Sequence, residues 1–194
     1  IAARSDVDVY ILSMTGSSVD PRTPLVGITG PIEDSDRAAL VRAFRVQRHR
    51  DYEQDPRLGV IALTEIGSRA LSPATNDPGT AIEVVAALQR VFDAVLTQNR
   101  SDDVTHGHVL LRPVGLTDLV TDAFRPIARD GAGIVEVQVR LQKCLAALDR
   151  CAPAQEHVFR AMADHAYARA RVALDEWDVD DLERVHHAEF DRLP

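Results

Sequence analysis

The sequence has 194 residues, a formal net charge of -8 at pH 7, and 45% hydrophobic and 27% charged residues. This balance is typical of a globular chain rather than a disordered one, and the length fits one large domain or one domain with a small appendage. The negative charge argues against a nucleic-acid partner, because binding phosphates requires clustered positive charge. Aromatic residues make up only 5%, so we expect a core of Leu, Val, Ile and Ala on packed helices.

The N-terminal part of the sequence predicts a small β unit. Residues 7–12 and 24–28 are short runs of β-forming apolar residues, and the turn-rich segment 15–22 lies between them. A third short strand is expected within 108–113, pairing with this unit. Residues 1–4 resemble the last turn of a helix that begins upstream, so we expect the chain to be a fragment of a longer protein.

Hydrophobic side chains recur at helical spacing through most of the remaining chain. Asp55-Pro56 and Asp77-Pro78 each place a capping residue before a proline at the first helical position. The expected helices cover residues 35–48, 56–71, 78–98, 117–129, 134–150, 153–174 and 180–193. The sequence therefore predicts a mainly α fold, α+β overall: a helical bundle of about six to seven helices with a small N-terminal β unit. The expected domains are residues 1–30 for the β unit and 31–194 for the helices.

The longest apolar runs are only a few residues long, whereas a membrane-spanning helix needs about 20. We therefore expect no segment of this chain to cross a bilayer. Cys144 and Cys151 stand about two turns apart along one expected helix, a separation of roughly 11 Å that a disulfide cannot bridge. Both are expected to be free thiols.

The polar loop between the second and third expected helices is a candidate binding site. It holds Ser72, Asn76 and Asp77 at the positive end of the next helix, with Arg69 before it and Thr80 after it. These side chains and the amides of the helix start suit a small polar or anionic group. The alternative, which the sequence favours, is that Asp77 caps the helix while Arg69 and Ser72 tie the loop shut.

Glu53 and Asp55 would join Glu65 and Asp77 in a carboxylate cluster if these two helices pair antiparallel. Such clusters bind Mg²⁺ or Ca²⁺ or perform acid–base chemistry. Their spacing matches no metal-binding loop, however, and the chain has 30 acidic residues, so chance grouping is the favoured explanation.

No motif nominates a catalytic centre. The sequence lacks Gly-x-Ser-x-Gly, a glycine-rich phosphate loop, a dinucleotide fingerprint and His-x-x-x-His. We therefore predict no catalytic residue, no metal ligand and no cofactor.

One ordered set of short motifs resembles a known family. The motifs are Glu53-Gln54-Asp55-Pro56 with Gly59, Ala70-Leu71-Ser72-Pro73, Asn76-Asp77-Pro78 and Thr80-Ala81. They resemble the signature of domain of unknown function 2254, a bacterial family described as predicted membrane proteins, and the resemblance covers nearly the whole chain. It implies a soluble C-terminal part of an inner-membrane protein with transmembrane helices upstream. Because the family has no established activity, only the importance of the Ser72–Thr80 loop carries over.

The leading hypothesis is a domain without enzymatic activity that serves ligand sensing, regulation or assembly of the membrane part. Its expected partners are its own upstream transmembrane region and further copies of itself, and unpaired cysteines favour the cytoplasmic side of the membrane. One alternative is a metal-assisted hydrolase-type enzyme using the Arg69–Thr80 loop. The other is the extramembrane gate of a channel or transporter.

Overall fold

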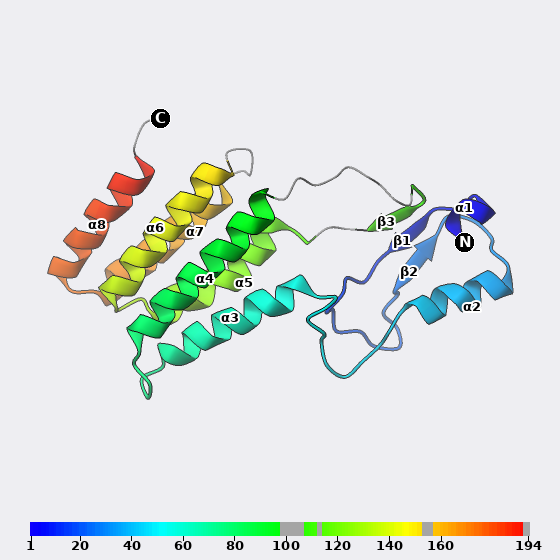
Figure 1. Cartoon of the computed structure of the whole chain (residues 1–194), viewed down its shortest axis with the longest axis horizontal. Helices are drawn as coiled ribbons and strands as arrows, with labels where there is room; N and C mark the ends of the chain where they lie inside the picture. The colour runs from blue at the N-terminus through cyan, green and yellow to red at the C-terminus, as the bar shows by residue number, and fades with distance from the viewer. Residues whose placement is uncertain (98–106, 112–113, 153–156, 192–194) are drawn as a thin grey trace. The chain divides into compact units, whose positions relative to one another are not determined.

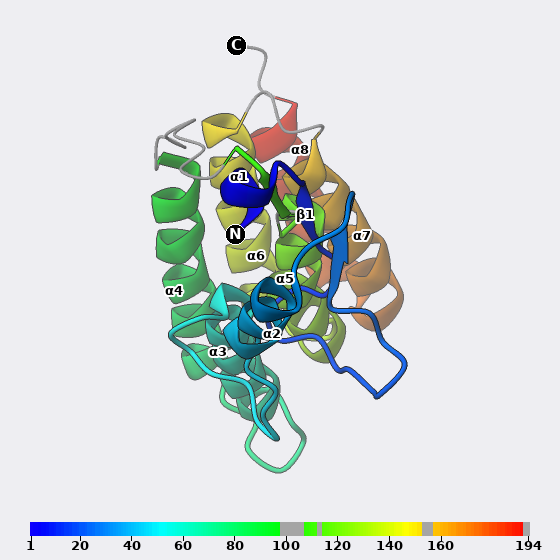
Figure 2. The same ribbon diagram turned by 90° about the vertical axis from the view of Figure 1, so that its right-hand side faces the viewer.

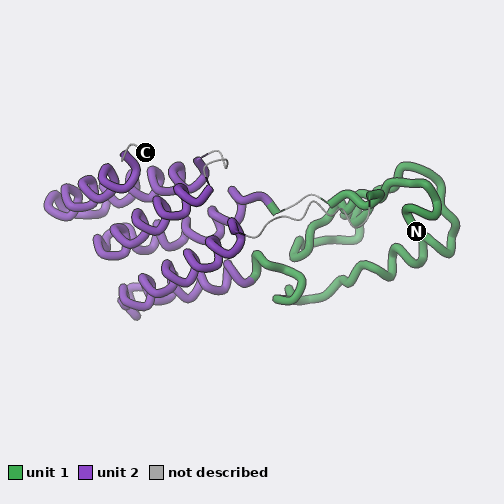
Figure 3. Tube along the Cα trace, turned by 45° about the horizontal axis from the view of Figure 1, so that its top comes forward, with its two compact units in different colours: residues 1–58, 100–114 green, residues 59–99, 115–194 purple. Residues whose placement is uncertain are grey.

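The computed structural model describes residues 1–97, 107–111, 114–152 and 157–191. The chain forms two compact units, shown in different colours in Figure 3. Unit 1 comprises Ile1–Leu58 and Arg100–Val114, and unit 2 comprises Gly59–Asn99 and Gly115–Pro194. The boundaries of these units differ from those of the domains expected from the sequence, residues 1–30 and 31–194. The expected domains stay a prediction.

Unit 1 contains a three-stranded sheet in the order β2-β1-β3. β1 (Val9–Ile11) pairs antiparallel with β2 (Val26–Ile28) and parallel with β3 (Val109–Leu111). The expected pairing of the later strand with the N-terminal β unit is thus confirmed, although residues 112 and 113 of the expected segment lie outside the described residues. The sheet joins segments about a hundred positions apart in sequence, as the register of Val9 with Val109 illustrates.

Two helices complete unit 1 in Figure 1: α1 (Ala2–Ser5) and α2 (Asp34–Ala43). The two are joined by an ion pair between Arg4 and the buried Asp36. α2 ends before the predicted residue 48, because Phe44 adopts an extended backbone with φ -94° and ψ 128°. Val41 and Val46 are 65% and 67% exposed, so the predicted apolar face meets no core that would stabilise further helical turns.

Unit 2 is entirely helical in its described residues (Figure 1). Its helices are α3 (Pro56–Ala70, whose first three residues belong to unit 1), α4 (Pro78–Thr97), α5 (Leu116–Asp130), α6 (Val135–Cys151), α7 (Val158–Ala173) and α8 (Glu176–Phe190). These bounds agree closely with the predicted helices for α3 to α6. α8 begins four residues before the predicted start, because the carboxylate of Asp175 caps it by accepting a hydrogen bond from the Asp178 amide at 3.0 Å. Residues 153–156 and 192–193 of the last two predicted helices lie outside the described residues.

α6 is the central helix of unit 2 and packs against α4, α7 and α8, while α5 packs against α7 (Figure 2). Three aromatic rings meet in the core. The Phe92 ring centroid lies 5.4 Å from that of Phe124 and 5.8 Å from that of Phe159. The remaining core is mostly Leu, Val, Ile and Ala, as expected. The elements confirm a mainly α fold with a small sheet. Within the described residues, none of the helices combines the length and the apolar character that a bilayer span demands.

Both cysteines are free thiols, as predicted. Cys144 is fully buried on α6, and this burial raises its pKa to about 12. A thiol with so high a pKa stays protonated at neutral pH and is a poor nucleophile. Cys144 is therefore part of the core, whereas Cys151 is exposed at the end of the same helix.

A polar network lies within the α6–α7–α8 interface. His186, only 8% exposed, places Nδ1 2.9 Å from Gln142 Oε1, and Gln142 Nε2 donates to the carbonyl of Ala163 at 3.0 Å. The His186 ring also stacks on Tyr167 with centroids 4.6 Å apart. Burial lowers the pKa of His186 below its usual value, with the carboxylate of Asp164 acting in the opposite direction.

We predict a pH-dependent contribution of His186 to stability. A histidine whose pKa is lowered by folding binds fewer protons in the folded state, so its stabilising effect is lost as pH falls below the unfolded pKa. The stability advantage of the wild type over His186→Gln should shrink between about pH 7 and about pH 5. Urea unfolding at several pH values measures this difference, with His165→Gln, an exposed residue on α7, as the control. An advantage that grows toward low pH would contradict the prediction.

Candidate functional site

The predicted Ser72–Thr80 loop follows α3 and leads into α4. Asp77 lies at the start of α4, where Oδ1 accepts a hydrogen bond from the Thr80 amide at 3.0 Å and Oδ2 accepts one from the Thr80 hydroxyl at 2.6 Å. These two bonds lower the pKa of Asp77. Asp77 therefore caps α4, the structural role that the sequence favoured.

The rest of the loop is held by its own hydrogen bonds. The Ser72 hydroxyl donates to the Arg69 carbonyl at 2.7 Å, and the Asn76 amide donates to the Ser72 carbonyl at 2.9 Å. Asn76 has a left-handed backbone with φ 46°, a conformation that asparagine tolerates well. The structure thus brings Ser72, Asn76, Asp77 and Thr80 together in one self-bonded turn. Whether they bind a ligand stays a prediction.

The capping role of Asp77 predicts a loss of stability in Asp77→Ala. Because the pKa of Asp77 is lowered on folding, its contribution is present above the unfolded pKa and is lost as pH falls through the lower folded value. At neutral pH, Asp77→Ala should melt a few degrees below the wild type, and the gap should close in acid. Thermal melts followed by circular dichroism at several pH values test this, with the exposed Thr75→Ala as control. An equal gap at every pH would contradict it.

The other two predicted site residues precede α3, at the opposite end of that helix from the loop. Glu53 is exposed. Asp55 is 2% exposed, and its Oδ2 lies 2.5 Å from Arg50 Nε. Among the described residues, no group of three or more His, Cys, Asp or Glu side chains has a geometry that would hold a metal ion. The partner of Asp55 is thus Arg50, which also lies in unit 1.

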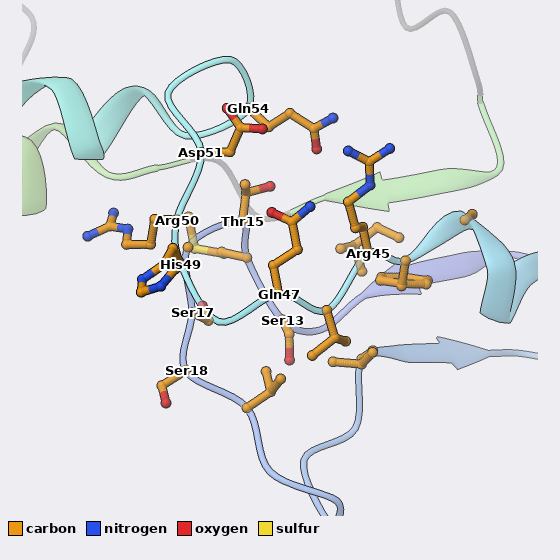
Figure 4. Close-up of a pocket in the computed structure, with 18 of the residues that line it drawn as sticks. Ser13, Thr15, Ser17, Ser18, Arg45, Gln47, His49, Arg50, Asp51 and Gln54 are labelled. Carbon is orange, nitrogen blue, oxygen red and sulfur yellow. The ribbon is translucent and has the colours of Figure 1, made fainter.

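A cavity of about 680 Å³ lies in unit 1 (Figure 4). One wall is the turn that follows β1, and the other is the last turn of α2 with the segment that follows it. The first wall supplies the hydroxyls of Ser13, Thr15, Ser17 and Ser18, and the second supplies Arg42, Arg45, Gln47, Arg48, His49 and Arg50, with Asp51 and Gln54 beyond them. In Figure 4 the polar ends of Thr15, Arg45, Gln47 and Gln54 point toward a common space. The cavity thus gathers several hydrogen-bond donors and strong positive charge.

Gly16 lines this cavity and also lies against the ion pair between the buried Asp55 and Arg50. Its φ of 81° lies in the left-handed region, and a Cβ there would overlap the Asp55 carboxylate and lie 2.8 Å from Arg50 Nε. Glycine is therefore required for both backbone conformation and space. The turn after β1 therefore packs against the Asp55–Arg50 pair at Gly16.

The sequence contains two separate signals for this cavity. The turn-rich segment 15–22 and the charged segment that includes Arg48 and Arg50 are each visible in the sequence. Neither has a motif spacing, and they lie about 30 positions apart. Only the folded structure brings their side chains to one cavity.

Comparisons with known proteins identify relatives. The sequence model of the family described as "Predicted membrane protein (DUF2254)" matches residues 1–147. Uncharacterized proteins of Mycobacterium bovis and Mycobacterium tuberculosis are 41% identical over 64 residues, which is 33% of this chain. The match spans only 12% of the length of each of these relatives. No solved structure matches significantly.

Proposed function

Because the chain belongs to the family of predicted membrane proteins called domain of unknown function 2254, we propose that it is an extramembrane sensing domain that binds a regulatory ligand. The observation that carries this proposal is the cavity of unit 1. Its volume of about 680 Å³ lies within the range of small-molecule sites, roughly 300–1,000 Å³. Its walls combine apolar side chains with many polar groups, and the polar ends of Thr15, Arg45, Gln47 and Gln54 point toward a common space in Figure 4.

The charges of the helical unit support an aqueous location. Ion pairs join Arg150 to Glu189 at 3.3 Å and Arg160 to Asp191 at 3.2 Å. The two arginine side chains are 58% and 41% exposed. Exposed charged groups are costly in hydrocarbon and suit water.

The membrane-embedded part belongs, in this proposal, to segments of the full-length protein other than these 194 residues. The length of the curated relatives supports this, since the matched region is a small fraction of each. The domain then has its own transmembrane region as a partner. We place the domain on the cytoplasmic side of the membrane, where free thiols such as Cys144 and Cys151 persist. Self-association follows as a further proposal, because extramembrane domains of symmetric membrane proteins meet around the symmetry axis.

Native mass spectrometry of the purified chain tests the sensing role. We expect a co-purified small molecule in stoichiometric amount, released by gentle unfolding. Thr15→Trp, which fills the cavity from its hydroxyl-rich wall, should lose this mass. Ser35→Trp is the control, since Ser35 is exposed in the same unit but does not line the cavity.

The same spectra separate sensing from assembly. A chain that carries no bound mass after growth in rich and minimal media, and that forms concentration-dependent oligomers, would contradict sensing and support assembly of the membrane part. The hydrolase alternative invokes loop residues that are engaged in capping and local bonds. It stays a prediction, as does the gate alternative.

A further inference from the structure

We propose that the cavity of unit 1 binds a phosphorylated small molecule. This inference rests on the proposed ligand-binding function and names the chemical class of the ligand. Residues 37–50 contain five arginines and no acidic residue, in a chain whose net charge is -8. Four of these arginines line the cavity, with Asp51 as its acidic side chain.

Three of the four cavity arginines have no counter-ion among the described residues. Arg50 binds Asp55, whereas Arg42, Arg45 and Arg48 form no ion pair in the described part of the chain. Positive residues that line one cavity repel one another, and an anion bound there reduces this repulsion. Guanidinium groups also present paired N–H donors that match the oxygens of a phosphate.

The opposite wall explains why phosphate fits better than a carboxylate. The hydroxyls of Thr15, Ser17 and Ser18 line the cavity and make no hydrogen bond within the described residues. Together with the arginines they supply more donors than the two oxygens of a carboxylate accept. A phosphate monoester carries about two negative charges and three strong acceptor oxygens at neutral pH.

The size and the remaining walls require an organic group beside the phosphate. A cavity of about 680 Å³ far exceeds the volume of inorganic phosphate. Ile11, Met14, Leu25 and Phe44 supply apolar walls, and the amides of Gln47 and Gln54 add polar contacts. Asp51 would repel a phosphate and suits a hydroxyl or amino group elsewhere on the ligand.

The first experiment uses the arginine side-chain Nε–H signals in NMR spectra of the purified chain. A phosphate pocket of this kind should bind inorganic phosphate weakly, so about 10 mM, roughly ten times a dissociation constant of 1 mM, is the working concentration. We expect inorganic phosphate and glycerol 3-phosphate to shift the signals of Arg42, Arg45 and Arg48. Sodium chloride at equal ionic strength should leave them unchanged. Equal responses to chloride and to both phosphates would overturn the proposal.

A pair of variants ties the signal to the cavity. Arg45→Gln combined with Arg48→Gln should weaken binding of glycerol 3-phosphate at least about tenfold, because charge-assisted hydrogen bonds are lost. Arg90→Gln combined with Arg125→Gln removes the same charge from exposed positions of α4 and α5 and should leave the affinity unchanged. An equal loss in both double variants would show a general charge effect and contradict a cavity site.

Two further measurements identify the source of the phosphate and separate this inference from the proposed function. Co-sedimentation with vesicles of phosphatidic acid, compared with phosphatidylcholine, identifies a lipid headgroup, whereas binding of glycerol 3-phosphate without vesicle binding identifies a soluble ester. Phosphorus is then measured in the molecule that co-purifies with the chain. A stoichiometric ligand without phosphorus would overturn the phosphate inference and leave the sensing function standing. A chain with neither bound mass nor phosphate response would contradict both.

Discussion

Replacing Phe92 by alanine is expected to lower the free energy of unfolding of the helical unit by about 3–5 kcal/mol. Phe92 is 1% exposed and contacts Phe124 and Phe159 at the centre of the core. The substitution removes most of a buried ring and leaves a cavity among residues of α4, α5 and α7, which relaxation fills only in part. Urea unfolding followed by far-UV circular dichroism measures the loss.

Trp177→Ala is the matched control for this prediction. Trp177 is a larger aromatic residue on α8, but it is 83% exposed. Its replacement should change the free energy of unfolding by no more than about 0.5 kcal/mol. Similar losses in both variants would mean that the aromatic cluster is not the centre of the cooperative unit.

The helices of unit 2 could be predicted from sequence because local signals and burial agree. Asp77-Pro78 marks the start of α4, and Val85, Leu88 and Phe92 recur at helical spacing and are buried together. Where this agreement fails, the prediction fails. α2 was expected to continue to residue 48 because Val41, Phe44 and Val46 resemble an apolar face, yet Val41 and Val46 are exposed. Spacing predicts a face but does not show that a core exists to cover it.

The candidate site divides in the same way. The capping role of Asp77 follows from local spacing, because an Asp before Pro at a helix start has few alternatives. The cavity of unit 1 depends on contact between the turn after β1 and the segment after α2, neither of which has a periodic pattern or a motif. The two segments meet where Gly16 packs against the Arg50–Asp55 pair. Gly16 and Asp55 lie far apart in the sequence, and no motif links them. Their contact could therefore not be predicted before the fold was known.

Replacing Asp55 is expected to destabilise unit 1. Its side chain is 2% exposed and pairs with Arg50. It also accepts a hydrogen bond of 3.3 Å from the Leu58 amide, at the start of α3. Asp55→Ala leaves Arg50 without this partner and α3 without its cap. Since Arg50 is 32% exposed, water compensates in part, and we expect a loss of about 2–4 kcal/mol.

Asp55→Asn separates the two roles of this residue. Asparagine is a good helix cap but carries no charge, so it should retain hydrogen-exchange protection at the Leu58 amide while losing the ion pair. Asp55→Ala should lose both. Glu53→Ala, an exposed carboxylate two positions away, should change neither. If the pair holds the cavity walls together, both Asp55 variants weaken phosphate binding and Glu53→Ala does not, whereas unchanged binding in Asp55→Asn would mean that the turn at Gly16 holds its place without the charge.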